Sequence, residues 1–310
     1  MSAPRAITLV EVGPRDGLQN EATVLSPELR AEFTRRLEAA GARRIEAASF
    51  VHPKLVPQMA GAEAVLAALP ATPGTSRIGL VLNVKGYERA ITTACDEINV
   101  SVAATDGFGL KNQGLAVRDQ MAMVAEIISR QSNTAPGGVA PSLSVTMSVV
   151  WGCPFDGEVD PQQVRALVAE LAGLGVAEIA LADTIGVADP WAVRRLIDTI
   201  RPELGAARLR LHFHDTRNTG VANSFAAIEA GADVLDASCG GIGGCPFAPG
   251  ATGNVATEDL VYMLERAGFD TGYDLSALIE TSHWIGEQLG RPVPSRVARS
   301  GGFPTPKGRG

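Results

Sequence analysis

The chain has 310 residues, of which 45% are hydrophobic and 20% charged, and its formal net charge is −7 at pH 7. This composition allows a large apolar core and excludes a disordered chain, a collagen-like repeat and a minimal disulfide scaffold. The acidic balance argues against a nucleic-acid-binding protein, and no apolar run approaches the roughly 18 residues of a membrane span.

Apolar, β-branched runs alternate with helical patterns along the chain and predict eight strands. The runs are Ile7–Val12, Arg43–Phe50, Ile78–Asn83, Glu97–Ala103, Leu143–Val150, Ala177–Asp183, Leu209–His214 and Val234–Ser238. Three helices between them begin with a capping side chain before a proline, at Ser26-Pro27, Asp160-Pro161 and Asp189-Pro190. A further helical segment, Leu275–Leu289, follows the last strand and helix.

A weak repeat marks three joints between a helix and the next strand. Gly41, Gly175 and Gly231 each end a helical segment shortly before a strand begins. Strands that alternate with helices predict a parallel sheet closed into a (β/α)8 TIM barrel. An open doubly wound sheet is the alternative, disfavoured because no dinucleotide-binding glycine motif follows an early strand. We predict one barrel domain over residues 1–299, with an extra C-terminal helical segment, and a disordered tail over 300–310.

Two histidines in one predicted strand form the sharpest chemical feature. His212 and His214 alternate along the strand and therefore point to the same face. We expect that face to be the barrel interior at the carboxyl end of the strand, where active sites of such barrels lie. The pair is interpreted as metal ligands, and two hydrogen-bonded core imidazoles are the alternative.

Acidic groups and one arginine follow or lie within other predicted strands. Asp16 is a candidate metal ligand and Arg15 a candidate fixed cation, although a plain turn is the alternative for both. Glu46 is expected inside its strand, on the same face as Ala48 and Phe50, and it needs a structural or catalytic partner because unpaired burial is costly. Asp183 ends another strand, and helix capping is its alternative role.

A glycine-rich loop, Gly240–Asn254, follows the last predicted strand. Glycine allows such a loop to move or its backbone to approach a ligand closely. Cys245 lies in the middle of the loop, so we interpret it as a lid with a reactive thiol. A phosphate-cradling loop is the alternative, disfavoured because the loop contains no lysine.

The cysteines lack the spacing of a zinc finger and are expected to be reduced thiols of a cytoplasmic protein. They are Cys95, Cys153, Cys239 and Cys245. We expect no signal peptide, because the apolar stretch Ile7–Val10 stops at Glu11. We also expect a homo-oligomer, a dimer, with no nucleic-acid or membrane partner.

Six segments in chain order carry a family resemblance. They are Val10–Glu21, Ile45–Phe50, Gly152–Phe155, Asp183–Gly186, His212–Thr216 and Gly243–Phe247. Together they resemble the 3-hydroxy-3-methylglutaryl-CoA (HMG-CoA) lyase family, over about residues 7 to 290. That family belongs to a larger group of metal-dependent barrel lyases and synthases acting on carbon–carbon bonds. The resemblance implies cleavage of a 3-hydroxy-3-methyl acyl-CoA to acetyl-CoA and a keto acid, which for HMG-CoA is acetoacetate.

The resemblance also implies roles for single residues. Its ligands for a divalent cation, Mg²⁺ or Mn²⁺, match Asp16, His212, His214 and Asn254. Its enolate-stabilising arginine matches Arg15, its proton-transfer acids match Asp183 and Glu46, and its loop cysteine matches Cys245. Gln19 and Asn112 match positions that bind the acyl-CoA substrate. Ligation by nitrogen and oxygen without thiolate suits Mg²⁺ or Mn²⁺ better than a structural Zn²⁺.

Three segments depart from the usual sequence of the family: Ala104–Gly109, Thr146–Val149 and Arg217-Asn218. The catalytic set is intact while these positions differ, so citramalyl-CoA is the alternative substrate. Two other functions use the same barrel: a condensing synthase or keto-acid aldolase, and a non-catalytic scaffold. The Cys245 loop argues against the first, and the complete set of metal and proton-transfer residues argues against the second.

Overall fold

Eight parallel strands close into a barrel in the computed structural model, which describes residues 6–134, 140–244 and 253–304. The order around the barrel is β1-β10-β9-β8-β5-β4-β3-β2. The bounds are β1 Thr8–Glu11, β2 Arg44–Ser49, β3 Ser76–Val81, β4 Glu97–Ala103, β5 Ser142–Ser148, β8 Glu178–Asp183, β9 Arg208–Phe213 and β10 Val234–Ala237. Each lies within two residues of its predicted ends. The predicted TIM barrel is confirmed, and a short hairpin of β6 (Gly152–Cys153) and β7 (Gly157–Glu158) is additional.

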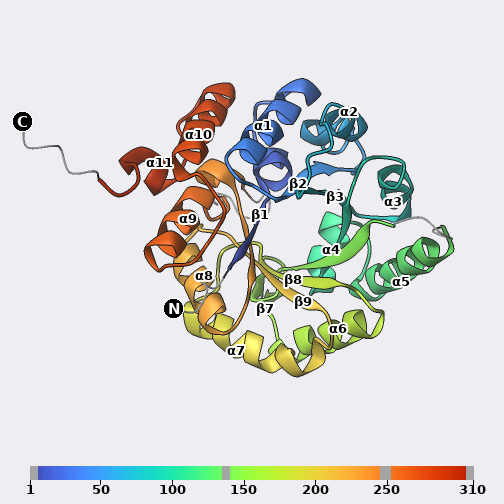
Figure 1. Cartoon of the computed structure of the whole chain (residues 1–310). Helices are drawn as coiled ribbons and strands as arrows, with labels where there is room; N and C mark the ends of the chain where they lie inside the picture. Colours follow the sequence, from blue (N-terminus) through green and yellow to red (C-terminus); the bar gives the residue numbers. More distant parts are fainter. Residues whose placement is uncertain (1–5, 135–139, 245–252, 305–310) are drawn as a thin grey trace, which may run out of the picture.

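Helices surround the barrel on the outside, as Figure 1 shows. Their bounds are α1 Pro27–Ala39, α2 Ala62–Ala67, α3 Val84–Ala90, α4 Asp106–Asn112, α5 Val117–Thr134, α6 Pro161–Gly173, α7 Pro190–Ile200, α8 Gly220–Glu229, α9 Thr257–Arg266, α10 Leu275–Leu289 and α11 Arg296–Ser300. The three predicted caps are confirmed, because Ser26, Asp160 and Asp189 each accept a backbone N–H of the first helical turn. No helix in the described ranges is long and apolar enough to cross a membrane.

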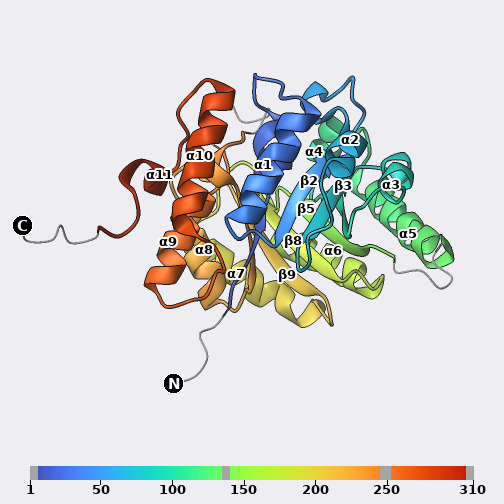
Figure 2. The ribbon, with the colours of Figure 1, turned by 45° about the horizontal axis from the view of Figure 1, so that its top comes forward.

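The C-terminal segment lies against the first helix of the barrel. Helix α10 covers the predicted Leu275–Leu289 and runs beside α1 in both views (Figures 1 and 2), with Trp284 and Phe33 ring centroids 6.2 Å apart. Beyond α11, the Phe303 ring lies 4.5 Å below the Arg266 guanidinium. The last part of the predicted tail, residues 305–310, falls outside the described ranges.

The amino-terminal end of the barrel interior holds a closed set of ion pairs. Arg44 of β2 donates to Glu97 of β4 at 2.9 and 2.5 Å and to Glu178 of β8 at 3.0 Å from two nitrogens. Ser76 of β3 donates to the same Glu97 at 2.5 Å. We call these four residues the lower layer. Arg44 offsets one of the two carboxylate charges, and Arg210 of β9, whose NH1 lies 3.4 Å from Glu178 Oε1, offsets the other, which makes their burial tolerable.

A β-bulge in β2 changes which of its side chains face inward. Glu46 pairs with Ile78 of β3, whereas Ala48 pairs with Gly79, so one residue is inserted between them. Ile78 packs with the interior residues of β1 and β10, and a Cβ on Gly79 would lie 2.8 Å from the Phe50 ring on the outer side. The expectation that Glu46 shares a face with Ala48 and Phe50 is therefore wrong.

Candidate active site

The turn after β1 carries two of the predicted site residues. Gly13–Gly17 forms a short π-helix, and a side chain at Gly17 would meet Ile242 at 2.7 Å and Ser238 at 2.8 Å. The buried Glu11 carboxylate accepts the N–H groups of Gly13 at 2.8 Å and Cys239 at 2.9 Å, so it ties this turn to the end of β10. This close backbone approach directs Arg15 and Asp16 toward the barrel mouth.

Asp16 meets His212 of β9 and His214, which follows that strand, at the same mouth. The Nε2 atoms of His212 and His214 each lie 3.9 Å from Asp16 Oδ2, and one ligand atom from each of the three residues lies within 4.8 Å of the others. Asn254 Nδ2 donates to the same Asp16 oxygen at 2.9 Å. The structure thus brings together all four predicted ligands, which with Arg15 we call the upper layer.

These residues fit a divalent cation. The 3.9 Å separations are too long for hydrogen bonds and suit two ligands that each lie about 2 Å from one shared cation. Within the described residues, the buried Asn254 Oδ1 has no hydrogen-bond donor and could serve as a ligand. Burial lowers the pKa of His214 to about 4, which keeps that imidazole neutral at pH 7, as metal binding requires.

Burial and the neighbouring groups shift the pKa of Asp16 in opposite directions. Burial alone would raise the pKa of the carboxyl, but the Arg15 guanidinium above all holds it well below its usual range. Arg15 NH1 donates to Asp16 Oδ1 at 2.6 Å. Asp16 is therefore an ionised carboxylate at any pH near neutrality, ready to bind a cation.

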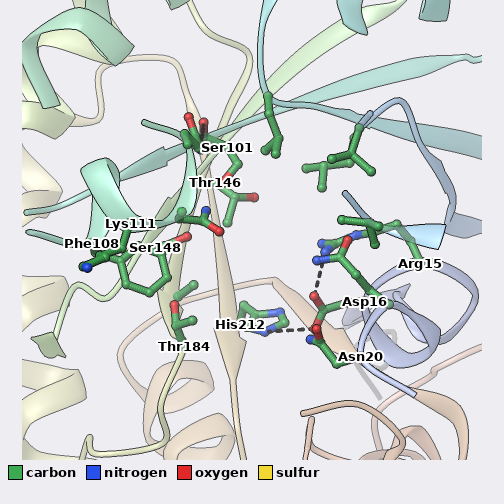
Figure 3. Close-up of a pocket in the computed structure, with 18 of the residues that line it drawn as sticks. Arg15, Asp16, Asn20, Ser101, Phe108, Lys111, Thr146, Ser148, Thr184 and His212 are labelled. Atoms are coloured by element: carbon green, nitrogen blue, oxygen red, sulfur yellow. Dashed lines mark hydrogen bonds and ion pairs between the residues drawn. The ribbon is translucent and has the colours of Figure 1, made fainter. Parts of the chain in front are cut away.

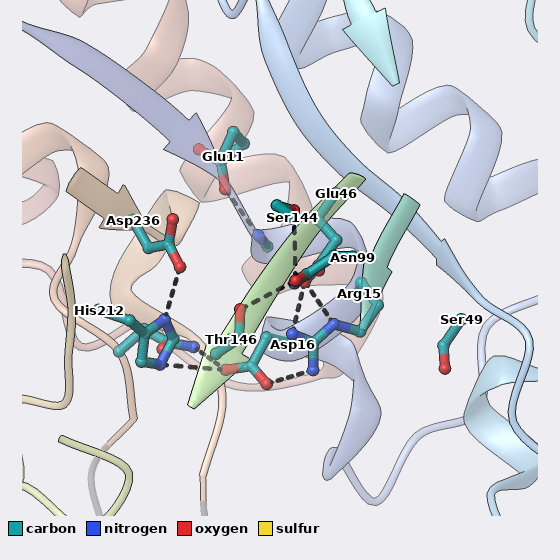
Figure 4. A network of polar contacts seen from close by, with 12 residues as sticks. Glu11, Arg15, Asp16, Glu46, Ser49, Asn99, Ser144, Thr146, His212 and Asp236 are labelled. Atoms are coloured by element: carbon teal, nitrogen blue, oxygen red, sulfur yellow. Dashed lines mark hydrogen bonds and ion pairs between the residues drawn. The ribbon is translucent and has the colours of Figure 1, made fainter. Parts of the chain in front are cut away.

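Glu46 lies behind Arg15 rather than in the cavity (Figure 4). Its Oε2 accepts Arg15 Nε at 2.5 Å, and its Oε1 accepts Asn99 Nδ2 at 2.9 Å. Asn99 Oδ1 in turn accepts Ser144 at 3.3 Å and Thr146 at 3.1 Å. Both carboxylate oxygens are thus engaged, which fits a residue that orients the arginine.

A cavity of about 680 Å³ opens in front of the upper layer. Gln19 and Asn112, the two predicted substrate-binding residues, both line it. Figure 3 shows Phe108, Lys111 and Ser148 on the side opposite Arg15 and Asp16. Ser101 and Thr146 line the cavity between these two sides (Figure 3). The cavity therefore has one wall with Arg15 and Asp16 and an opposite wall where Lys111 lies beside the Phe108 ring and the Ser148 hydroxyl.

Asp183 is not part of the cavity lining. In the pairing of β8 with β9, Ala182 lies beside His212, and both line the cavity. Asp183 lies beside Phe213, and both face away from it. Its two oxygens accept the N–H groups of Val187 and Ala188, each at 2.9 Å. Val187 and Ala188 lie in the loop before α7, whose N-cap is Asp189, so Asp183 caps no helix and the alternative of a helix cap is wrong. Its contacts hold the loop that carries the cavity residue Thr184.

Two further residues of the site were missed at the level of sequence. Asp236 of β10 accepts His212 Nδ1 at 3.0 Å, and Asn99 of β4 joins Glu46. Both had a usable signal, because alternation along Val234–Ser238 and Glu97–Ala103 places these polar residues on the inner face. Cys245 lies outside the described residues. Cys95, Cys153 and Cys239 are buried free thiols.

Comparisons with known proteins agree with this geometry. The HMGL-like family model matches residues 6–285. The chain is 43% identical to the (R)-citramalyl-CoA lyase of Chloroflexus aurantiacus, over 96% of this chain and 95% of that protein. It is 40% identical to the 3-hydroxy-3-isohexenylglutaryl-CoA/hydroxymethylglutaryl-CoA lyase of Pseudomonas aeruginosa, over 97% and 98% of the two chains.

A solved structure is similar over nearly the same length. It is an HMG-CoA lyase from Acinetobacter baumannii in complex with coenzyme A and 3-methylmalate, with a TM-score of 0.91, 37% identity and coverage of 97% and 98% of the two chains. The fold, the Asp-His-His cluster typical of a divalent metal site and these full-length relatives lead to one conclusion. The chain belongs to the HMGL-like family and is an acyl-CoA lyase of the HMG-CoA lyase type.

Proposed function

We propose that this enzyme cleaves a 3-hydroxy-3-methyl acyl-CoA to acetyl-CoA and a keto acid, with HMG-CoA as the first candidate and acetoacetate as its product. One observation carries the proposal: a cation-ligand cluster and an ion-paired arginine stand side by side at the mouth of one cavity. Breaking the bond between C2 and C3 requires loss of the C3 hydroxyl proton and stabilisation of a thioester enolate. The cation would promote loss of the hydroxyl proton, and Arg15 would stabilise the enolate.

We propose Mg²⁺ or Mn²⁺ as the cation, held by Asp16, His212, His214 and Asn254. Neutral imidazole nitrogens with carboxylate and amide oxygens, and no thiolate among them, suit these ions. When bound, such a cation lowers the pKa of the substrate hydroxyl and orients the substrate carboxylate.

Arg15 would stabilise the enolate oxygen of the departing thioester. Its guanidinium is always charged, and Glu46 and Asp16 hold it from two sides before substrate arrives. A fixed donor of this kind acts on charge that develops only in the transition state and needs no reorganisation at that moment. Glu46 is thus a positioning residue in this scheme.

Proton delivery to the acetyl methylene is assigned to Cys245 on the resemblance alone, because a thiol is a stronger acid than a hydroxyl. Asp183 enters the scheme as a positioning residue, through the loop that carries Thr184. A homodimer and a cytoplasmic location stay predictions.

Citramalyl-CoA is the second candidate, and a specific observation favours it. Of the three segments that depart from the family's usual sequence, two contribute cavity-lining side chains, Phe108 from one and Thr146 and Ser148 from the other. Arg217 in the third segment instead donates to the carbonyls of Ile185 and Gly186. The same bond cleavage in citramalyl-CoA would give acetyl-CoA and pyruvate, and the (R)-specific relative carries that activity in its name.

A thioester panel tests the proposal. HMG-CoA and the two enantiomers of citramalyl-CoA are offered with Mg²⁺, with Mn²⁺ and with a chelator, and both acetyl-CoA and the keto acid are quantified. We expect metal-dependent acetyl-CoA release with one thioester strongly preferred. Acetoacetate identifies the first candidate and pyruvate the second. Equal turnover in a demonstrably metal-free preparation, or no acetyl-CoA from any of the thioesters, contradicts the proposal.

A further inference from the structure

The two histidines of the upper layer differ in what holds their second nitrogen. His212 Nδ1 lies 3.0 Å from Asp236 Oδ2, and both residues are buried. His214 Nδ1 is buried without a hydrogen-bond partner among the described residues. The two ring centroids are only 5.2 Å apart. Two neighbouring imidazoles therefore differ in whether a hydrogen bond holds their Nδ1 atom.

Asp236 is itself held from below by a buried arginine. Arg210 Nε lies 3.4 Å from Asp236 Oδ1, and Arg210 NH1 lies 3.4 Å from Glu178 Oε1 of the lower layer. Arg210 NH2 donates to Thr146 at 3.0 Å, which fixes the guanidinium against β5. Arg210 is 1% exposed, so its charge is screened little by water. A continuous series of charges therefore runs from Glu178 through Arg210 and Asp236 to His212.

A carboxylate can only accept a hydrogen bond, so the proton shared with Asp236 must reside on His212 Nδ1. In the neutral ring that cation binding requires, the Nε2 atom of His212 then carries a lone pair, and this is the atom that lies 3.9 Å from Asp16 Oδ2. The Nδ1–H form is the tautomer that a metal ligand at Nε2 requires. His214, without such a partner, has no comparable constraint on its tautomer within the described residues.

We propose that Asp236, held by Arg210, is a positioning residue that locks His212 in the Nδ1–H tautomer and thereby strengthens cation binding. The inference deepens the proposed function, but it concerns the metal site and not the choice of thioester. A carboxylate behind a ligating imidazole fixes the ring and raises its basicity, and losing it typically weakens metal binding by about 10–100-fold. His212 is then the better supported of the two imidazole ligands.

Nitrogen NMR of the metal-free enzyme labelled with ¹⁵N-histidine tests the tautomer directly. The chain has only four histidines, His52, His212, His214 and His283, so single His→Gln variants suffice to assign the spectrum. At an alkaline pH at which the His212 ring is neutral, we expect the Nδ1–H form in the native chain and a mixture of tautomers in Asp236→Asn. A native His212 in the Nε2–H form overturns the proposal, whatever the variant does.

Binding of Mn²⁺ alone, followed by electron paramagnetic resonance, tests the second half. We expect about 10–100-fold weaker binding in Asp236→Asn, and weaker binding in Arg210→Gln as well. Ser224→Ala is the matched control, because Ser224 is as buried as the site residues but belongs to α8, where its hydroxyl donates to the Gly220 carbonyl outside both layers. Native Mn²⁺ affinity in a folded Asp236→Asn overturns the proposal. Neither measurement uses a thioester, so failure of the proposed function leaves this test intact.

Discussion

The lower and upper layers of the barrel interior are built from the same kinds of buried charged residue, yet they differ in how their polar atoms are used. In the lower layer, Arg44 bonds two carboxylates and Ser76 completes one of them. In the upper layer, the buried His214 Nδ1 and Asn254 Oδ1 have no partner among the described residues. A cluster of buried charges is therefore not enough to identify a metal site. What identifies one here is that the ligand atoms lie close together and yet are not hydrogen-bonded to one another.

The largest expected effect is the loss of the upper layer's shared carboxylate. Asp16→Ala removes the oxygen toward which both imidazoles converge, so Mn²⁺ affinity should fall more than about 100-fold, beyond the 10–100-fold scale of outer residues. Turnover should fall with it, and a chelator should abolish the native activity that Mg²⁺ or Mn²⁺ restores. Full activity of Asp16→Ala without detectable metal would mean that this cluster is a core feature like the lower layer.

The next effect concerns Cys245, which belongs to neither layer. Cys245→Ser should reduce turnover by about 10²–10⁴-fold, the range of general acid catalysis, because a hydroxyl is a far weaker acid than a thiol. Mn²⁺ affinity should stay native, because Asn254 is the expected ligand from this loop. Thiol reagents should inactivate the enzyme, and bound substrate should slow them. Near-native turnover by the serine variant would make the thiol a bystander.

Breaking the lower layer should affect stability and spare the site. Glu97→Gln replaces a carboxylate that accepts Arg44 and the Ser76 hydroxyl by a neutral amide, and removing one partner of a buried ion pair costs about 3–5 kcal/mol in comparable cases. Urea unfolding of the metal-free protein measures the loss, and Mn²⁺ binding of the folded fraction should be unchanged. A large drop in Mn²⁺ affinity with native stability would erase the distinction between the two layers.

Arg15 tests whether the upper layer contains chemistry besides metal binding. Arg15→Gln should lower kcat by about 10²–10³-fold, the cost of one transition-state donor, with a smaller change in KM. Arg15→Lys should rescue little, because a point charge cannot replace the fork held by Glu46 and Asp16. A variant that changes KM alone would assign Arg15 to substrate binding.

The smallest effect is a pH dependence of stability that comes from two buried carboxyls outside both layers, Glu11 and Glu258. No cation among the described residues contributes to the shifts of their pKa values. Burial raises the pKa of both Glu11 and Glu258 from an ordinary 4.5 to about 7. The folded protein then binds more protons than the unfolded chain between these values, so the free energy of unfolding should fall as pH rises from about 4.5 to 7, by about 3 kcal/mol for one such carboxyl. Urea unfolding at pH 5 and pH 8 measures the slope, and Glu11→Gln should reduce it. A flat profile in the native chain would contradict the assignment.

The barrel was predictable because periodicity, caps and turn glycines all pointed to the same fold. Gly41, Gly175 and Gly231 adopt φ values of 107°, 81° and 90°, as their place after a helix required. The His212–His214 pair was predictable from alternation alone. The bulge in β2 was not, because an inserted residue leaves no mark on hydrophobic periodicity and reverses every side chain after it.

The partners of single carboxylates were also beyond the sequence. Glu46 was left between a structural and a catalytic role, and only the contacts with Arg15 and Asn99 distinguish them. Asp183 carried both a proton-transfer and a capping interpretation, and its hydrogen bonds to Val187 and Ala188 follow from loop geometry that no spacing encodes. The sequence does not show which strands lie opposite each other in the closed barrel. Contacts between side chains of strands that are distant in sequence therefore cannot be predicted from it.

The reactive groups of the cavity and the residues of β4 and β5 that line it come from different elements, and this has a consequence for how such an enzyme can acquire a new substrate. The reactive groups come from the turn after β1 and from the end of β9, whereas Ser101 lies on β4 and Thr146 and Ser148 lie on β5. Thr146 is bonded to Asn99 and Arg210, so a replacement there would disturb the supports of Arg15 and His212 together. Ser148, the last residue of β5, also lines the cavity. Substitutions of Ser148 should therefore change which acyl group is accepted with little loss of turnover. Substitutions of Thr146 should change the acyl preference and reduce turnover at the same time.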